Sequence, residues 1–232
     1  MKKILVTGGN SRFVLTLKKI KTSLKFIYTT KNDLNITSRK DIKKNIKKYK
    51  PDYILHVAGL SRPLKQHETD IQKSIFLNII GTSNLVIECS IKKVKLIYLS
   101  SSYIYQGKKG NYKETDPVLP WSNYGWSKLG GESAVQMYNN SLILRCCMTE
   151  KPFLHKAAYS NVKTNFAYQE DIAKNLIKVI HKKGIFNLGG KSQTIFDFAK
   201  KENKMIKKKI SRGEFPFRQD MSLSKIEKIL KK

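Results

Sequence analysis

The sequence is poor in acidic residues and in cysteine. Its 232 residues hold 17 Asp plus Glu against 46 Lys plus Arg, which gives a formal net charge of +29 at pH 7. The cysteines are Cys89, Cys146 and Cys147, an odd number with no C-x-x-C and no metal-ligand spacing. This pattern excludes a disulfide framework and a cysteine-ligated zinc site, and it indicates a reducing compartment.

Long apolar runs are also missing. No stretch of about 18 consecutive apolar residues occurs, so we expect no transmembrane helix and no membrane partner. The first residues lead directly into the apolar run Lys3–Val6. We therefore expect no signal peptide and a cytoplasmic location.

The excess positive charge comes almost entirely from lysine. Only 6 of the 46 basic residues are arginines, and the lysines are scattered as pairs such as Lys18-Lys19 and Lys182-Lys183. Proteins that read nucleic acids use arginine and aromatic side chains on a recognisable fold. We interpret the lysines as a solvated surface and expect no specific nucleic-acid partner. The alternative, charge-driven nucleic-acid binding, predicts an affinity that falls steeply with salt.

Apolar segments of strand length alternate with helical segments, and 40% of the residues are hydrophobic. This alternation predicts an α/β fold, namely a Rossmann-type doubly wound parallel sheet with a small, abbreviated C-terminal lobe. The predicted strands are Lys3–Val6, Leu24–Thr29, Tyr53–Val57, Lys95–Leu99 and Ser141–Arg145, and the longest predicted helices are Asp41–Lys50 and Ile75–Ile91. We predict a dinucleotide-binding domain over 1–145 and a short substrate lobe over 146–232, interleaved with the last sheet elements.

Two segments carry the predicted chemistry. Tyr124 and Lys128 lie four residues apart in a predicted helix, so both side chains leave the same face. An ammonium group near a phenol stabilises the phenolate and lowers its pKa. Upstream, an apolar strand ends in Ser100-Ser101-Ser102. The carboxyl ends of strands are where open α/β sheets bind ligands.

These segments, together with the N-terminal Thr7-Gly8-Gly9 turn, resemble the extended short-chain dehydrogenase/reductases. The chain looks most like the dTDP-4-dehydrorhamnose reductases and the related nucleotide-sugar epimerases. Further matching pieces are Leu34–Thr37, Pro51–Gly59, Asn78–Leu85 and Arg218–Leu223. The resemblance implies an NAD(P)-dependent enzyme that reduces a nucleotide-linked 4-keto sugar. Two alternatives are a nucleotide-sugar 4-epimerase or dehydratase of the same family and a degenerate, non-catalytic binding module.

The resemblance also assigns site residues. The catalytic residues are Ser101, Tyr124 and Lys128, in which Ser101 and Tyr124 bond the sugar C4 oxygen and Lys128 bonds the nicotinamide ribose and tunes Tyr124. Ser100 and Ser102 are expected to be inert neighbours of Ser101. The cofactor-binding residues are Gly8, Asn10, Ser11, Arg12, Phe13, Lys31, Asn35, Ile36, Ala58, Gly59, Leu60, Tyr124 and Lys128. No metal site is expected.

Two features bear on the cofactor. Ser11 and Val14 stand where the family pattern has its later glycines, and we expect Val14 to push the first helix outward or to reorient it. Lys31 follows the second strand where NAD-preferring enzymes carry an acidic residue, which favours NADP(H) over NAD(H). The resemblance further suggests a homodimer.

Two polar residues receive supporting or neutral roles. Asn78 stands at the family's usual asparagine position, and the resemblance implies that it bonds neighbouring backbone and holds the strand ends in register. His67 lies in the polar stretch from Ser61 to Asp70, and we expect it to be solvated.

Overall fold

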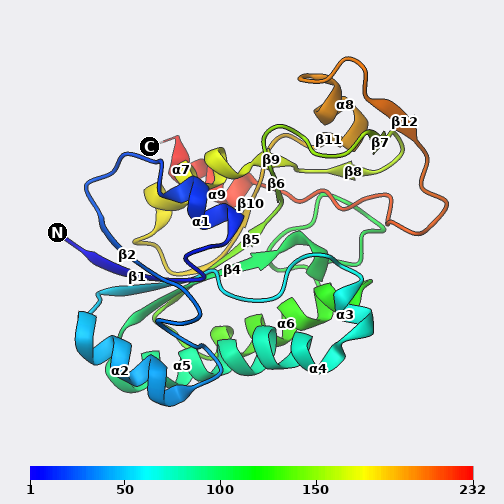
Figure 1. The fold of residues 1–232 in the computed structure, drawn as a ribbon. Coiled ribbons are helices and arrows are strands. Elements are labelled where there is room, and N and C mark those ends of the chain that lie inside the picture. Colours follow the sequence, from blue (N-terminus) through cyan, green and yellow to red (C-terminus); the bar gives the residue numbers. More distant parts are fainter. Residues whose placement is uncertain (232) are drawn as a thin grey trace.

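The computed structural model describes residues 1–231, and a single six-stranded sheet organises them (Figure 1). The strands follow the order β10-β5-β4-β3-β1-β2, and every neighbouring pair is parallel. Their bounds are β1 Lys3–Thr7, β2 Lys25–Thr29, β3 Tyr53–His56, β4 Lys95–Ser101, β5 Ser141–Cys146 and β10 Gly184–Leu188. The chain reverses its winding direction between β1 and β3, which confirms the predicted doubly wound sheet. Ligands of such sheets bind at this reversal, beyond the carboxyl ends of the strands.

Helices cover both faces of the sheet (Figure 1). One face carries α1 Arg12–Leu17, α7 Gln169–Val179 and α9 Ser224–Leu230. The other carries α2 Arg39–Tyr49, α4 Ile71–Ser74, the π-helical η1 Ile75–Ile80, α5 Gly81–Lys92 and α6 Asn123–Gln136. Apolar residues recur at helical spacing in α7, where Ile172, Leu176 and Val179 are fully buried against the sheet. The β-strands themselves are apolar on both sides because both faces are covered.

The covering helix formed by α4, η1 and α5 is longer than predicted. By length and composition alone, its 22 residues from Ile71 to Lys92 could cross a membrane, although no unbroken apolar run is present. In this structure the segment packs against α6, α2 and β4. Its inner side buries the polar residues Asn78, Thr82 and Glu88. It therefore serves here as a layer of the fold.

A small lobe lies beyond the carboxyl ends of the strands (Figure 1). It contains β7 Ala157–Tyr159 paired with β12 Lys207–Lys209, and β8 Lys163–Thr164 paired with β11 Gln193–Thr194. Helix α8, Ile195–Lys200, completes a separate apolar cluster in the lobe. The three lysines of β12 have exposed side chains, while their backbone pairs with β7. The chain then returns to the main body through α9, which contacts α7 and β10. The domain boundary after residue 145 stays a prediction.

Candidate active site

The turn after β1 is held against the ends of two neighbouring strands. Gly8 has a φ of +74°, and a Cβ atom there would lie 2.8 Å from the Ala58 nitrogen. A Cβ on Gly9 would lie 3.0 Å from the Thr29 carbonyl oxygen. The Thr7 hydroxyl oxygen accepts bonds from the backbone N–H groups of Val57 and Ala58, at 3.1 and 3.0 Å. Only glycine fits these two positions, because a Cβ atom would strike the backbone of Ala58 or Thr29. We call this turn of bare backbone the cradle; turns of this kind let a pyrophosphate approach the chain.

The helix after the turn is short and well packed. Ser11 caps α1 by accepting a bond from the Val14 N–H at 3.3 Å. Val14 is fully buried in the core between α1 and the sheet, together with Phe13 and Leu17. Because the Phe13 side chain lies in this core, only its backbone can face a cofactor. Asn10 and Arg12 are exposed.

The predicted adenine-side residues lie on the loop after β2. Lys31 is exposed, and the nearby Asp33 carboxylate accepts bonds from the Thr30 N–H and hydroxyl, both at 2.8 Å. Asn35 uses its side-chain oxygen to accept bonds from the N–H and hydroxyl of Thr37. Ile36 is buried, with its side chain against Gly81. The loop is therefore fixed by its own polar groups, and Lys31 is left to face solvent.

Asn78 has the supporting role predicted for it. Its side-chain oxygen accepts from the Leu60 N–H at 2.7 Å, and its amide group donates to the Leu60 carbonyl and to the Ser127 hydroxyl, both at 2.8 Å. These bonds fix the buried Leu60 and the exposed Gly59 at the end of β3. They also join η1 to α6, which carries Tyr124 and Lys128.

The structure brings Ser101 and Tyr124 together. Ser122 caps α6 by accepting a bond from the Gly125 N–H at 3.2 Å. Gly125 and Gly131 let this helix press closely against the backbone of Tyr103 and Asn78. At its first turn, the Tyr124 phenol lies near the Ser101 hydroxyl at the end of β4. Burial raises the pKa of Tyr124 above its ordinary value, while the neighbouring Ser101 hydroxyl and the charge of Arg62 act to lower it.

Lys128 lies on the same face of α6, one turn after Tyr124. Its ammonium group lies 4.1 Å from the centre of the Tyr98 ring, a cation–π contact. Burial lowers the pKa of Lys128 to about 8. The nearby Cys146 and Glu132 act in the opposite direction and raise it. The prediction that Lys128 lowers the pKa of Tyr124 is wrong. Burial dominates, and the pKa of Tyr124 is raised. The phenol stays protonated near neutral pH and is available as a proton donor.

The pKa of Lys128 sets an expected pH dependence. Below about pH 8 the side chain is an ammonium group, and above it the charge is lost. If Lys128 binds the cofactor ribose as a charged donor, turnover should fall as the pH rises through about 8. A pH profile of kcat from pH 6 to 10 measures this, and Lys128→Arg should move the alkaline limb upward because arginine keeps its charge. A profile that stays flat through pH 9.5 would contradict the role of Lys128.

A buried charge network lies next to Tyr124 and Lys128 on α6, and sequence reasoning missed it. Glu132, one further turn along α6, is 0% exposed and pairs with Arg145, 3% exposed, at 2.8 Å. The Ser100 hydroxyl donates to the other Glu132 oxygen at 2.5 Å. Arg145 also donates to the Tyr105 hydroxyl at 2.7 Å, which in turn donates to Asn187 at 2.8 Å. Ser100 is thus structural, and the network ties α6 to β5 and β10.

His67 was predicted to be solvated, and this prediction is wrong. It lies in the short helix α3, Gln66–Thr69, and is fully buried. Its Nδ1 lies 2.7 Å from the Ser74 hydroxyl, and its ring packs edge-on against Tyr124 at 5.1 Å. The Asn123 amide donates to Glu68 at 2.5 Å, which clamps α3 onto the start of α6. Nothing in the polar stretch around His67 signals this long-range contact.

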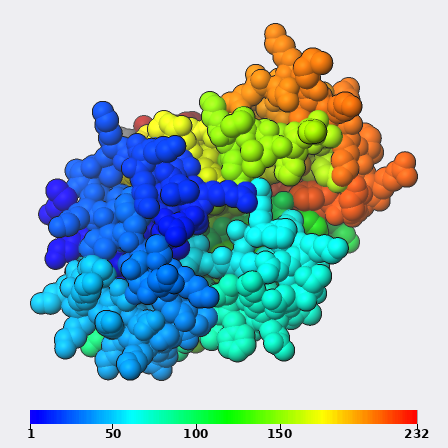
Figure 2. Space-filling view, in the orientation of Figure 1, coloured from blue at the N-terminus to red at the C-terminus, as the bar shows by residue number. Residues whose placement is uncertain are grey.

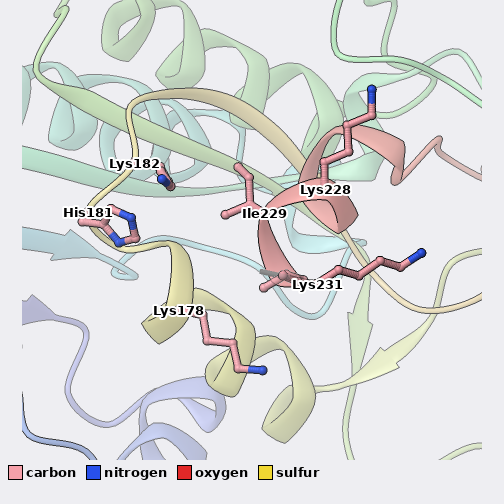
Figure 3. Close-up of a pocket in the computed structure, with 7 residues that line it drawn as sticks. Lys178, His181, Lys182, Lys228, Ile229 and Lys231 are labelled. Carbon is pink, nitrogen blue, oxygen red and sulfur yellow. The ribbon is translucent and has the colours of Figure 1, made fainter.

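A surface hollow lies away from this site. It lies between α7 and α9 and is lined by Lys178, His181, Lys182, Lys228, Ile229, Leu230 and Lys231 (Figure 3). The amines of Lys178, Lys228 and Lys231 point away from one another (Figure 3). They converge on no common point, so this hollow does not form an anion site. Among residues 1–231 no cluster of three or more His, Cys, Asp or Glu side chains could hold a metal ion.

Comparison with known proteins places this geometry in a family. Residues 1–149 match the family model described as RmlD substrate binding domain. The chain is 29% identical over 149 residues to the spore coat polysaccharide biosynthesis protein SpsK of Bacillus subtilis, covering 62% of this chain and 52% of that protein. It is 27% identical over 154 residues to a dTDP-4-dehydrorhamnose reductase of Aggregatibacter actinomycetemcomitans, covering 64% of this chain and 52% of that protein. The chain thus spans about half the length of these curated relatives.

A solved structure shows the same fold over nearly the whole chain. The dTDP-4-dehydrorhamnose reductase of Bacillus anthracis in complex with NADP superposes with a TM-score of 0.88 at 21% identity, covering 98% of this chain and 91% of that one. The family match extends over residues 1–149 of 232, which is more than half of the sequence. The chain therefore belongs to the family of the RmlD substrate binding domain.

Proposed function

We propose that this chain is an NAD(P)-dependent oxidoreductase that reduces a nucleotide-linked 4-keto sugar. The observation that carries the proposal is the Ser101–Tyr124 pair beside Lys128, at the carboxyl edge of a doubly wound sheet. The names of relatives support the substrate class, since a curated relative is a dTDP-4-dehydrorhamnose reductase. The structural neighbour in complex with NADP supports a nicotinamide cofactor.

The residues present fit such a cofactor. The turn of Gly8 and Gly9 presents bare backbone beside the ends of β2 and β3, as a pyrophosphate site requires, and the exposed Gly59 leaves the end of β3 open. When bound, the cofactor would supply a hydride to the keto carbon. Tyr124 donates its proton to the carbonyl oxygen, and Ser101 holds that oxygen by a hydrogen bond. Lys128 bonds the nicotinamide ribose.

The test of this function is cofactor consumption. The purified protein, mixed with NADPH and a dTDP-linked 4-keto-6-deoxy sugar, should consume one NADPH for each sugar reduced. Three results would each point elsewhere. Tightly bound cofactor that turns over without exchange would favour a 4-epimerase. Binding without turnover would favour a non-catalytic binding module. Sequence-blind, salt-sensitive binding of nucleic acid alone would show only that the protein is basic.

For the cofactor we propose a preference for NADP(H). Lys31 is exposed after β2, and the Asp33 carboxylate two residues later is partly engaged, because its Oδ2 accepts both bonds from Thr30. Lys31→Ala should lower the NADPH to NADH ratio of kcat/KM by about 5- to 10-fold, because a charge facing the 2′-phosphate is lost. Lys25→Ala, an exposed lysine at the start of β2, is the matched control. An unchanged ratio in Lys31→Ala would remove the basis for the preference.

We also propose that two copies associate through the outer face of the long covering helix. Apolar side chains on this face are exposed, namely Ile71, Ile75, Phe76, Ile80, Ile87 and Ile91. Light scattering should give twice the chain mass of 26.7 kDa. Phe76→Glu should return the mass to that of one chain.

The cytoplasmic location likewise remains a proposal, supported by three free, buried cysteines.

A further inference from the structure

Three segments that are distant in the sequence meet through one carboxylate. Arg12 begins α1, Arg62 lies on the loop after β3, and Glu150 follows β6, Met148–Thr149. The Arg12 Nη1 donates to Glu150 Oε1 at 2.6 Å, and the Arg62 Nη1 donates to Oε1 and Oε2 at 3.2 and 3.0 Å. In the space-filling view, the segments containing these residues (blue, cyan and yellow-green) meet at the rim of a hollow (Figure 2).

This cluster differs from a pair built to stabilise the fold. The Arg145 side chain is 3% exposed, whereas the Arg12 and Arg62 side chains are 57% and 40% exposed. Each guanidinium has five N–H donors, yet within residues 1–231 each bonds through Nη1 alone. One carboxylate faces two cations, which leaves a local charge of +1. The two arginines therefore have both charge and donors left for a further anion.

The position of the cluster indicates which anion it could receive. Arg12 lies three residues after Gly9 and begins α1, beyond the carboxyl end of β1. Arg62 is near enough to Tyr124 for its charge to lower the pKa of the phenol, although burial dominates. A ligand that reaches from the cradle to Tyr124 would pass these guanidiniums. Planar guanidinium groups bind phosphate oxygens bidentately, and two of them match the charge of a diphosphate.

We infer that Arg12 and Arg62 form a diphosphate-binding site that the Glu150 carboxylate occupies until the ligand enters. This inference rests on the proposed function for its ligand class, the diphosphate of a dinucleotide cofactor or of a nucleotide-sugar. Burial alone would raise the pKa of Glu150, but the two guanidiniums hold it below its ordinary value, so the side chain is charged at neutral pH. Glu150 then competes with the ligand for the arginines and repels its phosphates.

The test is the effect of Glu150→Gln on ligand affinity, measured by titration calorimetry with NADPH and, separately, with thymidine diphosphate. Removing the competing charge should tighten binding of one of them by about fivefold, while Arg62→Met should weaken the same ligand by about fivefold or more. Lys2→Met and Asp52→Asn are matched controls. These two residues form an ion pair of 2.9 Å at the amino ends of β1 and β3, whereas the proposed site lies beyond the carboxyl ends of the strands. Neither control should change either affinity by more than about twofold.

The two ligands separate the two sources of diphosphate. A change with NADPH alone assigns the site to the cofactor, and a change with thymidine diphosphate alone assigns it to the sugar nucleotide. Weaker binding in Glu150→Gln would show that Glu150 organises the arginines and would overturn the competition, and unchanged affinity for both ligands would overturn the site. Because binding is measured without turnover, a protein that reduces no sugar can still pass or fail this test.

Discussion

Tyr124→Phe should lower turnover by at least about 100-fold, because it removes the hydroxyl that transfers the proton to the sugar oxygen. The rest of the site should stay in place. The Tyr124 ring packs edge-on against His67 and Tyr103, at 5.1 and 5.6 Å between ring centres, and phenylalanine keeps both contacts. Steady-state kcat and the affinity for NADPH are the two measurements. We expect kcat to fall while the affinity for NADPH stays within a factor of about three.

Tyr103→Phe is the control for this substitution. Tyr103 is a second tyrosine at the same site, on the short 3₁₀ turn Ser102–Ile104, and burial raises its pKa. It is not the proposed donor, so removing its hydroxyl should change kcat only a few-fold. If the Tyr103 variant lost as much activity as the Tyr124 variant, or if the Tyr124 variant kept wild-type turnover, the assignment of the proton donor would be wrong.

Glu132→Gln should be the most destabilising single substitution in the site region. It leaves the Arg145 guanidinium buried without its counter-charge, although the bonds to Tyr105 and to the Glu114 carbonyl remain. Breaking a buried ion pair in this way costs about 3–5 kcal/mol of unfolding free energy. Urea denaturation of the wild-type protein and of Glu132→Gln measures this difference in unfolding free energy.

An ion pair on the surface serves as the reference for this loss of unfolding free energy. Glu170 and Lys174 form an ion pair within α7, and their side chains are 51% and 53% exposed. Glu170→Gln should cost less than about 1 kcal/mol, since exposed pairs contribute little. The double variant Glu132→Leu with Arg145→Met should be more stable than Glu132→Gln, because no buried charge is left unpaired. If Glu132→Gln stayed within about 1 kcal/mol of wild type, the network would not have the structural role described.

Much of the fold was predictable because parallel strands covered on both faces are continuous apolar runs. The segment Lys95–Ser101 shows this directly, since every residue in it is buried. The spacing of Tyr124 and Lys128 also fixed their common face, because helix geometry is local. The role of Asn78 followed from its position in the pattern of the family that the sequence resembles. Each of these predictions depends on a short stretch of sequence.

What the sequence did not reveal depends on contacts between distant segments. His67 lies in a polar stretch, and only the docking of α3 onto α6 buries it. Glu132 and Arg145 carry no local signal of their pairing, which requires β5 to lie beneath α6. The pKa of Lys128 reflects burial more than its neighbours in the sequence. The Glu150 cluster unites residues 12, 62 and 150, which no local pattern relates.

The most direct test of the central claim is a crystal structure of the protein with NADPH. We expect the pyrophosphate to lie in the cradle of Gly8 and Gly9, and the nicotinamide ring to face Tyr124 with its ribose bonded to Lys128. Cofactor density away from this edge of the sheet, or a nicotinamide remote from Tyr124 and Lys128, would contradict it.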